Sequence, residues 1–255
     1  ICVATLCALT MSAALVVVAS HAYADEPVAK PTPPPRTGFL DFNGYYDSRE
    51  ATGFTVNMLA NLPASLQYFS LTNFVNANDA RHLRDIDAFY SEQNLRWTPS
   101  ASLPFALTTQ WVVRGGEKND AVRLGGLWRV SKTRALANAF SAIGLYYQVG
   151  LHAYQFDFIE AGGWRGQIEH VYMCRPLKSS FGSRFYVSGF VDHNLWLQGP
   201  SGTKRSRILT EHQLGVRVAY GLHVVTELRY NPFLADERLG LAVGLQYMLR
   251  FQDRN

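Results

Sequence analysis

The chain has 255 residues, of which 47% are hydrophobic and 17% are charged, a low charged fraction beside the roughly 25% usual in a soluble domain. Its net charge is +4 and its acidic and basic residues are interleaved, which excludes the basic patch that a nucleic-acid-binding surface needs. Cys174 is the one cysteine after residue 24, so the rest of the chain has no intramolecular disulfide and no thiolate metal cluster.

Residues 1–24 are apolar, carry no charged side chain and end in Ala22-Tyr23-Ala24. An apolar run that ends in small-x-small before a polar stretch predicts a cleaved secretory signal peptide, with a transmembrane anchor as the alternative. The chain has no initial Met and no basic residue before this run, so we expect the natural sequence to begin further upstream. Residues 25–38 contain KPTPPPR and predict an extended, proline-rich periplasmic linker.

Residues 39–255 show the alternation of β-strands, and no helix-period pattern in them lasts more than two turns. We predict about twelve strands, most of them close to the ~9–11 residues that a tilted strand needs to cross a bilayer. The strand at 136–150 has the least certain register and can extend toward Phe156. The predicted ranges are 39–48, 53–61, 65–75, 86–97, 103–114, 119–131, 136–150, 164–175, 182–194, 207–220, 222–231 and 238–251.

The connections between these strands alternate between two kinds. One set is compact or contains proline: NLPAS, TPSAS, SKTRA, PLKSS and the Tyr220-Gly221 turn. The other set is mostly longer and more polar: REATG, NANDARHLRD, GGEKND, QFDFIEAGG, WLQGPSGTKR and NPFLADER. Short turns at one end and long loops at the other are typical of transmembrane barrels. An even number of strands then places both chain ends on the short-turn, periplasmic side.

The last strand shows the alternation most clearly. Large apolar residues occupy every second position from Leu239 to Phe251, opposite a face that contains Gly240, Gln246 and Arg250. In a closed barrel the apolar face meets lipid and the polar face meets the lumen. Strand length, strand number, connections and the export signal together favour an all-β fold, a transmembrane antiparallel up-and-down β-barrel, over a soluble sandwich. The terminal Phe251 resembles the signal that barrel-insertion machinery reads in outer-membrane proteins.

The polar face of several strands carries arginine together with acidic or amide residues. In a barrel of this size such side chains would line the pore and set its selectivity, or would pair with each other to fill the interior. The pore-lining and substrate-contact candidates are Asn43, Tyr45, Asp47, Tyr90, Glu92, Asn94, Arg96, Arg114, Arg123, Arg129, Arg217, Glu227 and Arg229.

Three segments resemble strands of the Tsx-like nucleoside-specific channels of the outer membrane: FLDFNGYYDSR, FYSEQNLRWTP and GWRGQIEHVYMCRPL. The resemblance is diffuse and spans most of the chain after residue 24. It implies a monomeric twelve-strand barrel that passes nucleosides, for which Tyr45 and Tyr90 would offer stacking faces worth about 1–3 kcal/mol per base. Two features depart from the family: Asn94 stands where a second acid is expected, and residues follow Phe251.

Enzymatic and metal-binding patterns are weak. Outer-membrane lipid hydrolases need a serine activated by histidine, and none of the seven histidines has a serine two positions on. Ser188 and His193 have an odd separation and should face opposite sides of one strand. His212 lies on an apolar face without an obvious nucleophile. The sequence has no His-x-x-x-His and, after residue 24, no cysteine pair, so we expect no metal and no cofactor.

These observations predict a non-enzymatic, monomeric channel in the outer membrane of a Gram-negative-type bacterium. It would be surrounded by outer-membrane lipid and would pass small polar solutes, nucleosides among them, by passive diffusion. Two alternatives stay open: a non-conducting barrel with a structural or adhesive role, and a lipid-modifying enzyme that uses His212.

Overall fold

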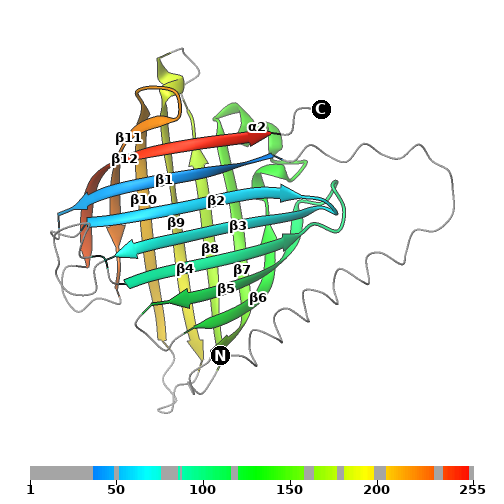
Figure 1. The fold of residues 1–255 in the computed structure, drawn as a ribbon. Coiled ribbons are helices and arrows are strands. Elements are labelled where there is room, and N and C mark those ends of the chain that lie inside the picture. The colour runs from blue at the N-terminus through cyan, green and yellow to red at the C-terminus, as the bar shows by residue number, and fades with distance from the viewer. Residues whose placement is uncertain are drawn as a thin grey trace. The chain divides into compact units, whose positions relative to one another are not determined.

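Twelve antiparallel strands close into one β-barrel in the computed structural model (Figure 1). The structure describes residues 37–48, 52–75, 86, 88–115, 120–157, 164–176, 181–197, 205–232 and 238–252. The predicted signal peptide and all but the last two residues of the predicted linker lie outside the described residues. Among the helices that are described, none is long and apolar enough to cross a membrane.

Each strand pairs with its neighbours in sequence, so the barrel has the up-and-down topology predicted for the fold. The last strand pairs with the first over the whole length of the first, from Thr37 opposite Gln252 to Asp47 opposite Ala242. The strands are β1 (Thr37–Asp47), β2 (Thr52–Leu62), β3 (Leu66–Val75), β4 (Ala88–Trp97), β5 (Phe105–Arg114), β6 (Ala121–Trp128), β7 (Leu145–Asp157), β8 (Trp164–Cys174), β9 (Phe185–Leu197), β10 (Arg205–Arg217), β11 (Leu222–Tyr230) and β12 (Leu239–Gln252).

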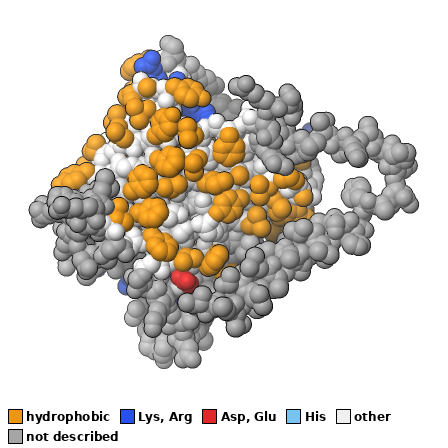
Figure 2. Space-filling view, viewed as in Figure 1, with side chains coloured by type: hydrophobic (Ala, Val, Ile, Leu, Met, Phe, Trp, Pro, Cys, Tyr) orange, Lys and Arg blue, Asp and Glu red, His pale blue; other side chains and the backbone are white. Residues whose placement is uncertain are grey.

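The two faces of the strands differ as the alternation predicts. In β12 every second residue from Leu239 to Phe251 is large, apolar and at least 42% exposed, whereas Ala242 and Gln246 between them are buried. Figure 2 shows hydrophobic side chains spread over the outer surface of the barrel, with a few charged ones near its edges. A belt of this kind is what a strand surface needs where it meets lipid.

Polar side chains interrupt the outer surface over β3 and β4. The hydroxyls of Thr72 and Ser91 lie 2.8 Å apart, and the Gln93 amide donates a hydrogen bond to Ser91 at 2.6 Å. The Tyr68 hydroxyl in turn donates to the Gln93 carbonyl. Because these groups bond to one another, each has a partner even where no water reaches it, which makes the patch compatible with a lipid-facing position.

The predicted strand at 136–150 is wrong over its first nine residues. The chain instead forms a 3₁₀ turn, η2 (Val130–Lys132), and a short helix, α2 (Ala137–Ala142), before β7 begins at Leu145. The sequence ANAFSA is rich in alanine, the residue with the highest helix propensity, and this local preference prevails where no neighbouring strand pairs with it. The turn out of the helix uses Gly144 at a φ of 65°, which glycine adopts without strain.

The predicted difference between the two ends of the barrel is wrong for two of the five connections that were expected to be short. We call the end where β1 begins and β12 finishes the terminal end, and the opposite one the distal end. The connection at 129–144 lies at the terminal end and is longer than any distal connection, the longest of which is 76–87. A second extended terminal connection, 175–184, contains η3 (Gly182–Arg184). The segments SKTRA and PLKSS, which were expected to form short turns, therefore belong to longer connections.

If the outer face of β12 meets lipid, an arginine placed on it should destabilise the barrel by an amount that depends on its depth in the bilayer. Leu245→Arg, near the middle of the strand, should lower the free energy of unfolding by about 2–4 kcal/mol, because it places a charge near the bilayer midplane. Leu239→Arg, at the distal end of the same face, should cost about 0–1 kcal/mol. Urea unfolding in phospholipid vesicles measures both. Equal costs would contradict the assignment of this face to lipid.

Candidate lumen site

The polar faces of the strands meet inside the barrel and enclose a cavity of about 920 Å³. It reaches from Arg114 and Arg165 at the distal ends of β5 and β8 to Arg96, next to the terminal end of β4. Its lining combines arginines, carboxylates and amides with apolar side chains such as Phe69, Leu71 and Phe190. The lining residues include Tyr90, Glu92, Arg96, Arg114, Arg123, Gln155, Gln167, Glu169, Asp192, Leu209, Glu211 and Arg229.

Arg123 is the centre of a hydrogen-bonded network on one wall of this cavity. Its Nη1 donates to the side-chain oxygens of Gln110 and Gln167, each at 2.6 Å, and its Nε donates to Gln155 at 2.9 Å. The Glu92 carboxylate lies 3.9 Å away and accepts a hydrogen bond from Gln110 at 3.0 Å. Three neighbours thus hold a guanidinium that is 6% exposed in one position.

Tyr90 and Asn94 join the same wall. The Tyr90 hydroxyl donates to Glu92, and the guanidinium carbon of Arg114 lies 4.9 Å from the centroid of the Tyr90 ring. A cation at that distance occupies one face of the ring. Asn94 is almost fully buried and accepts from Gln110 at 3.2 Å, so at this position an amide completes the network.

Arg229 organises the opposite wall with two carboxylates. Its Nη2 lies 2.6 Å from Glu211 and 3.0 Å from Glu227, and its Nε donates a second bond to Glu211 at 2.9 Å. Glu227 is 3% exposed, so its charge depends on this partner more than on solvent. Arg229 therefore forms ion pairs with two carboxylates, one on β10 and one on β11.

A network of tyrosine and glutamine side chains links β9 and β10 to β12 and β1. The Tyr186 hydroxyl contacts the side-chain oxygens of Gln213 at 2.7 Å and Gln246 at 2.5 Å, and Gln213 donates to the Tyr45 hydroxyl at 2.6 Å. Gly215 makes room for this arrangement, because a Cβ there would lie 2.2 Å from the Tyr186 ring. Along β10, Gln213 stands between Glu211, which lines the large cavity, and the terminal end of the barrel.

Near β1 the network continues through buried polar groups. Gln246 donates to Asp41 at 2.9 Å, and Asn43 also donates to Asp41. The predicted candidates Asn43 and Asp47 are both buried on the inner face of β1. Neither lines the large cavity, and neither does Tyr45, the stacking candidate predicted on the same face of this strand.

Two further candidates lie apart from the large cavity. Arg129 follows β6 at the terminal end, where its Nη1 donates to the Thr98 hydroxyl at 2.9 Å. Arg217 is the last residue of β10 and lines a second, smaller cavity at the terminal end. Six candidates line the large cavity: Tyr90, Glu92, Arg96, Arg114, Arg123 and Arg229. Asn94 and Glu227 belong to the hydrogen-bonded networks of its two walls but are not among its lining residues.

The sequence prediction missed a second group of titratable residues. His152 is 2% exposed, and its Nε2 lies 3.9 Å from the Glu169 carboxylate. Asp192 stands opposite Glu169 in the register of β8 and β9. The predicted strand at 136–150 could extend toward Phe156, but its register was the least certain of the twelve, so the face of His152 stayed unassigned. Glu169 and Asp192 could be placed next to each other only once the register between β8 and β9 was known.

Histidines on the outer face contact hydroxyl groups. His193 Nε2 is hydrogen-bonded to the Ser206 hydroxyl across β9 and β10, a pairing that sequence separation did not indicate, and His212 Nδ1 lies 2.8 Å from the Tyr172 hydroxyl. Within the residues that the structure describes, no acid orients the His193 ring, so two of the three groups of a hydrolytic triad are present. The described residues also contain no group of three or more His, Cys, Asp or Glu able to hold a metal ion.

No family model and no curated protein matches the chain. Among solved structures, the KdgM porin aligns with a TM-score of 0.46 at 12% identity, over 82% of this chain and 98% of that chain. The KdgM porin in complex with disordered oligogalacturonate aligns with a TM-score of 0.47 at 11% identity, over 82% and 98% of the two chains. An outer membrane channel from Pseudomonas putida F1 aligns with a TM-score of 0.41 at 11% identity, over 90% and 100%. At these values the similarity concerns the barrel fold and identifies neither a family nor a solute.

Because Arg229 pairs with both Glu211 and Glu227, substitutions of Arg229 and Glu227 should have coupled effects on stability. Arg229→Gln should lower the free energy of unfolding by about 2–3 kcal/mol, because it removes charged hydrogen bonds and leaves two neighbouring carboxylates unbalanced. Adding Glu227→Gln to this variant should recover part of the loss, because one of the two charges disappears. Urea unfolding of the refolded barrel measures both variants. A double variant that is no more stable than the single one would contradict this electrostatic account.

Proposed function

We propose that the chain forms a passive channel for small polar solutes in the outer membrane. The observation that carries the proposal is the contrast between the apolar outer surface and the charged and amide side chains that line a large cavity inside the closed barrel. A cavity of about 920 Å³ is large enough for a small solute. Its charged and amide lining provides hydrogen bonds that replace part of the water around a polar solute.

The organisation of the lining supports passage more than tight storage. Arg123 and Arg229 are held by several partners each, so they form a rigid wall and need not move for a solute to pass. Charges of both signs face the same space, which disfavours neither neutral nor zwitterionic molecules. Solutes would therefore exchange weak hydrogen bonds along the wall, as a conducting pathway requires.

Nucleosides are the first solutes to test. They are the solute class that the resemblance to Tsx-like channels implies, and the large cavity offers an aromatic ring beside acidic and basic groups. Arg114 covers one face of Tyr90, so a base would have only the opposite face for stacking. Glu92 and Arg123 next to it could bond to ribose hydroxyls.

We further propose that the channel is a monomer, acts without catalytic turnover and is inserted by the barrel-assembly machinery that reads β12. Among the residues that the structure describes, the His193–Ser206 contact is the feature that favours a lipid hydrolase instead. Release of fatty acid from phospholipid by the purified protein, lost in Ser206→Ala, would overturn the non-enzymatic part of the proposal and leave the fold untouched.

Substitution of adjacent residues on β10 tests the channel. Leu209 lines the large cavity, and its neighbour Ile208 is 46% exposed on the outer surface. In planar bilayers the refolded protein should give discrete conductance steps. Leu209→Trp should lower the step size by filling the cavity, and Ile208→Trp should leave it unchanged. Liposomes should take up uridine faster than a sugar of similar mass if nucleosides are preferred.

Absence of conductance, together with liposomes that stay impermeable to every probe, would contradict the channel and favour a structural or adhesive barrel. Equal effects of the two tryptophan variants would show that ions pass outside the large cavity. Both variants are first checked for the heat-modifiable electrophoretic mobility of a folded barrel, so that a folding defect is not read as a change in the pore.

A further inference from the structure

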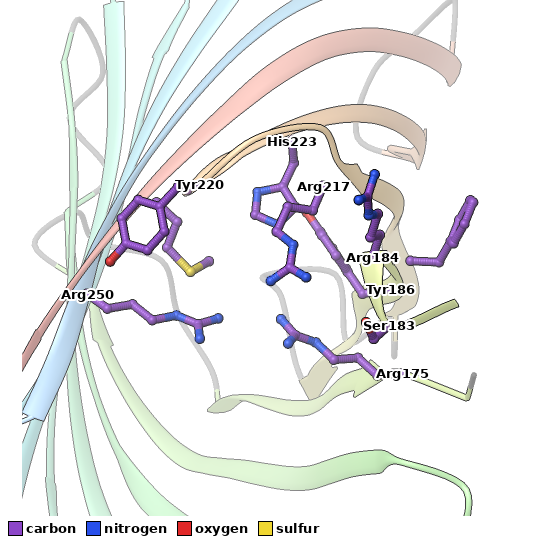
Figure 3. A pocket seen from close by; sticks show the side chains of 11 residues that line it. Arg175, Ser183, Arg184, Tyr186, Arg217, Tyr220, His223 and Arg250 are labelled. Carbon is purple, nitrogen blue, oxygen red and sulfur yellow. The ribbon is translucent and has the colours of Figure 1, made fainter. Parts of the chain in front are cut away.

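A second cavity, of about 90 Å³, lies at the terminal end between β8 and β12, and four arginines line it. Arg175 follows β8, Arg184 precedes β9, and Arg217 and Arg250 belong to the ends of β10 and β12. Figure 3 shows the guanidinium groups of Arg175, Arg217 and Arg250 pointing toward one common space from different sides. Three separate segments of the chain thus place like charges around one small cavity.

These arginines lack the acidic partners that Arg123 and Arg229 have. In the described part of the chain, none of the four forms an ion pair with an acidic residue, in contrast to Arg123 and Arg229. The contact of Arg175 with the Tyr186 ring, 6.0 Å from its centroid, does not neutralise its charge. Burial lowers the pKa of Arg175, and the charges of Arg250 and Arg217 lower it further.

A buried histidine completes the lining. His223 is 7% exposed, packs edge-on against Tyr186 at 5.6 Å between ring centroids, and its Nδ1 has no hydrogen-bond partner. A buried ring nitrogen without a partner is costly, and so are converging unpaired cations. A bound group with several acceptor oxygens would relieve both.

The surrounding sequence adds to the positive charge. The terminal connections 63–65, 98–104, 129–144, 175–184 and 218–221 contain no Asp or Glu, whereas they contain Arg129, Lys132, Arg134 and Arg175 among their basic residues. Burial lowers the pKa of Lys132, and the charge of Arg129 lowers it further. An anion that approaches this end therefore meets a positive field before it reaches the cavity.

We propose that the terminal cavity binds a single oxyanion, the phosphate or carboxylate group of a small solute or of a lipid headgroup, between Arg175, Arg217 and Arg250. Guanidinium groups match such oxyanions because each presents a planar fork of donors. The small volume admits one such group and excludes a whole nucleoside. The assignment of that group to a transported solute rests on the proposed channel function, whereas the binding site itself does not.

Binding of inorganic phosphate to the refolded full chain in a nonionic detergent tests the site directly. Calorimetry at low salt should detect saturable binding, and the double variant Arg217→Gln/Arg250→Gln should weaken it about tenfold or more. Arg134→Gln removes one charge from the same end outside the cavity and should leave the affinity unchanged. A second double variant, Arg175→Gln/Arg184→Gln, repeats the test if the first one fails to fold. Acetate replaces phosphate in a parallel titration to identify carboxylate binding.

The source of the oxyanion is tested in nanodiscs. If phosphatidylglycerol displaces phosphate and neutral lipid does not, the ligand is a headgroup; if neither does, it is a soluble anion. No binding of either anion, or binding that both double variants leave unchanged, overturns the proposal. Phosphate binding without conductance would overturn the channel and keep the site. Conductance without anion binding would do the reverse.

Discussion

The structure depends on one constraint: a backbone that crosses lipid must find all its hydrogen-bond partners within the protein. The pairing of β12 with β1 meets that constraint, because it joins the only two strands that would otherwise have a free edge. Closure also determines which face of every strand points outward and which points into the barrel. The face with Leu245 and Phe251 must be apolar over its whole height, and the face with Ala242 and Gln246 must accept whatever polar groups the neighbouring strands contribute.

The enclosed polar groups are arranged by the same closure. Arg123 and Arg229 lie on opposite sides of the barrel, and each is surrounded by carboxylates or amides from its own or nearby strands. A cation buried in this way is stable only if its partners stay in place, which makes the two walls rigid. The terminal cavity differs, because its arginines come from strand ends and connections, where no register places acidic residues opposite them. Balanced charge in the large cavity and unbalanced charge in the small one therefore follow from their positions in the barrel.

Features that depend on residues close together in the sequence could be predicted, whereas features that depend on contacts between distant segments could not. The lipid-facing face of β12 and the inward direction of Arg123 and Glu227 follow from alternation within one strand, and both were predicted correctly. The helix α2 was missed because its alanine-rich segment also fits a weak alternation, and only the absence of a pairing strand distinguishes the two. His193 and Ser206 are brought together by the register between β9 and β10, and Arg175, Arg217 and Arg250 by the closure of the barrel around its terminal end. No pattern in a single sequence reports that register, so the contacts could not be foreseen.

The two cavities suggest a direction for the molecule's selectivity. In the proposed channel, a solute that enters from the distal end would meet charges of both signs along the large cavity and would be selected chiefly by its hydrogen bonds. At the terminal end it would meet only positive charge on the described residues that line the small cavity, which would favour any anionic group it carries. The Tyr186–Gln213–Tyr45 network contains no charged side chain, and along β10 Gln213 lies between Glu211 of the large cavity and Arg217 of the small one. Hydrogen-bonding capacity and charge would then act on a solute one after the other, each through a different set of side chains.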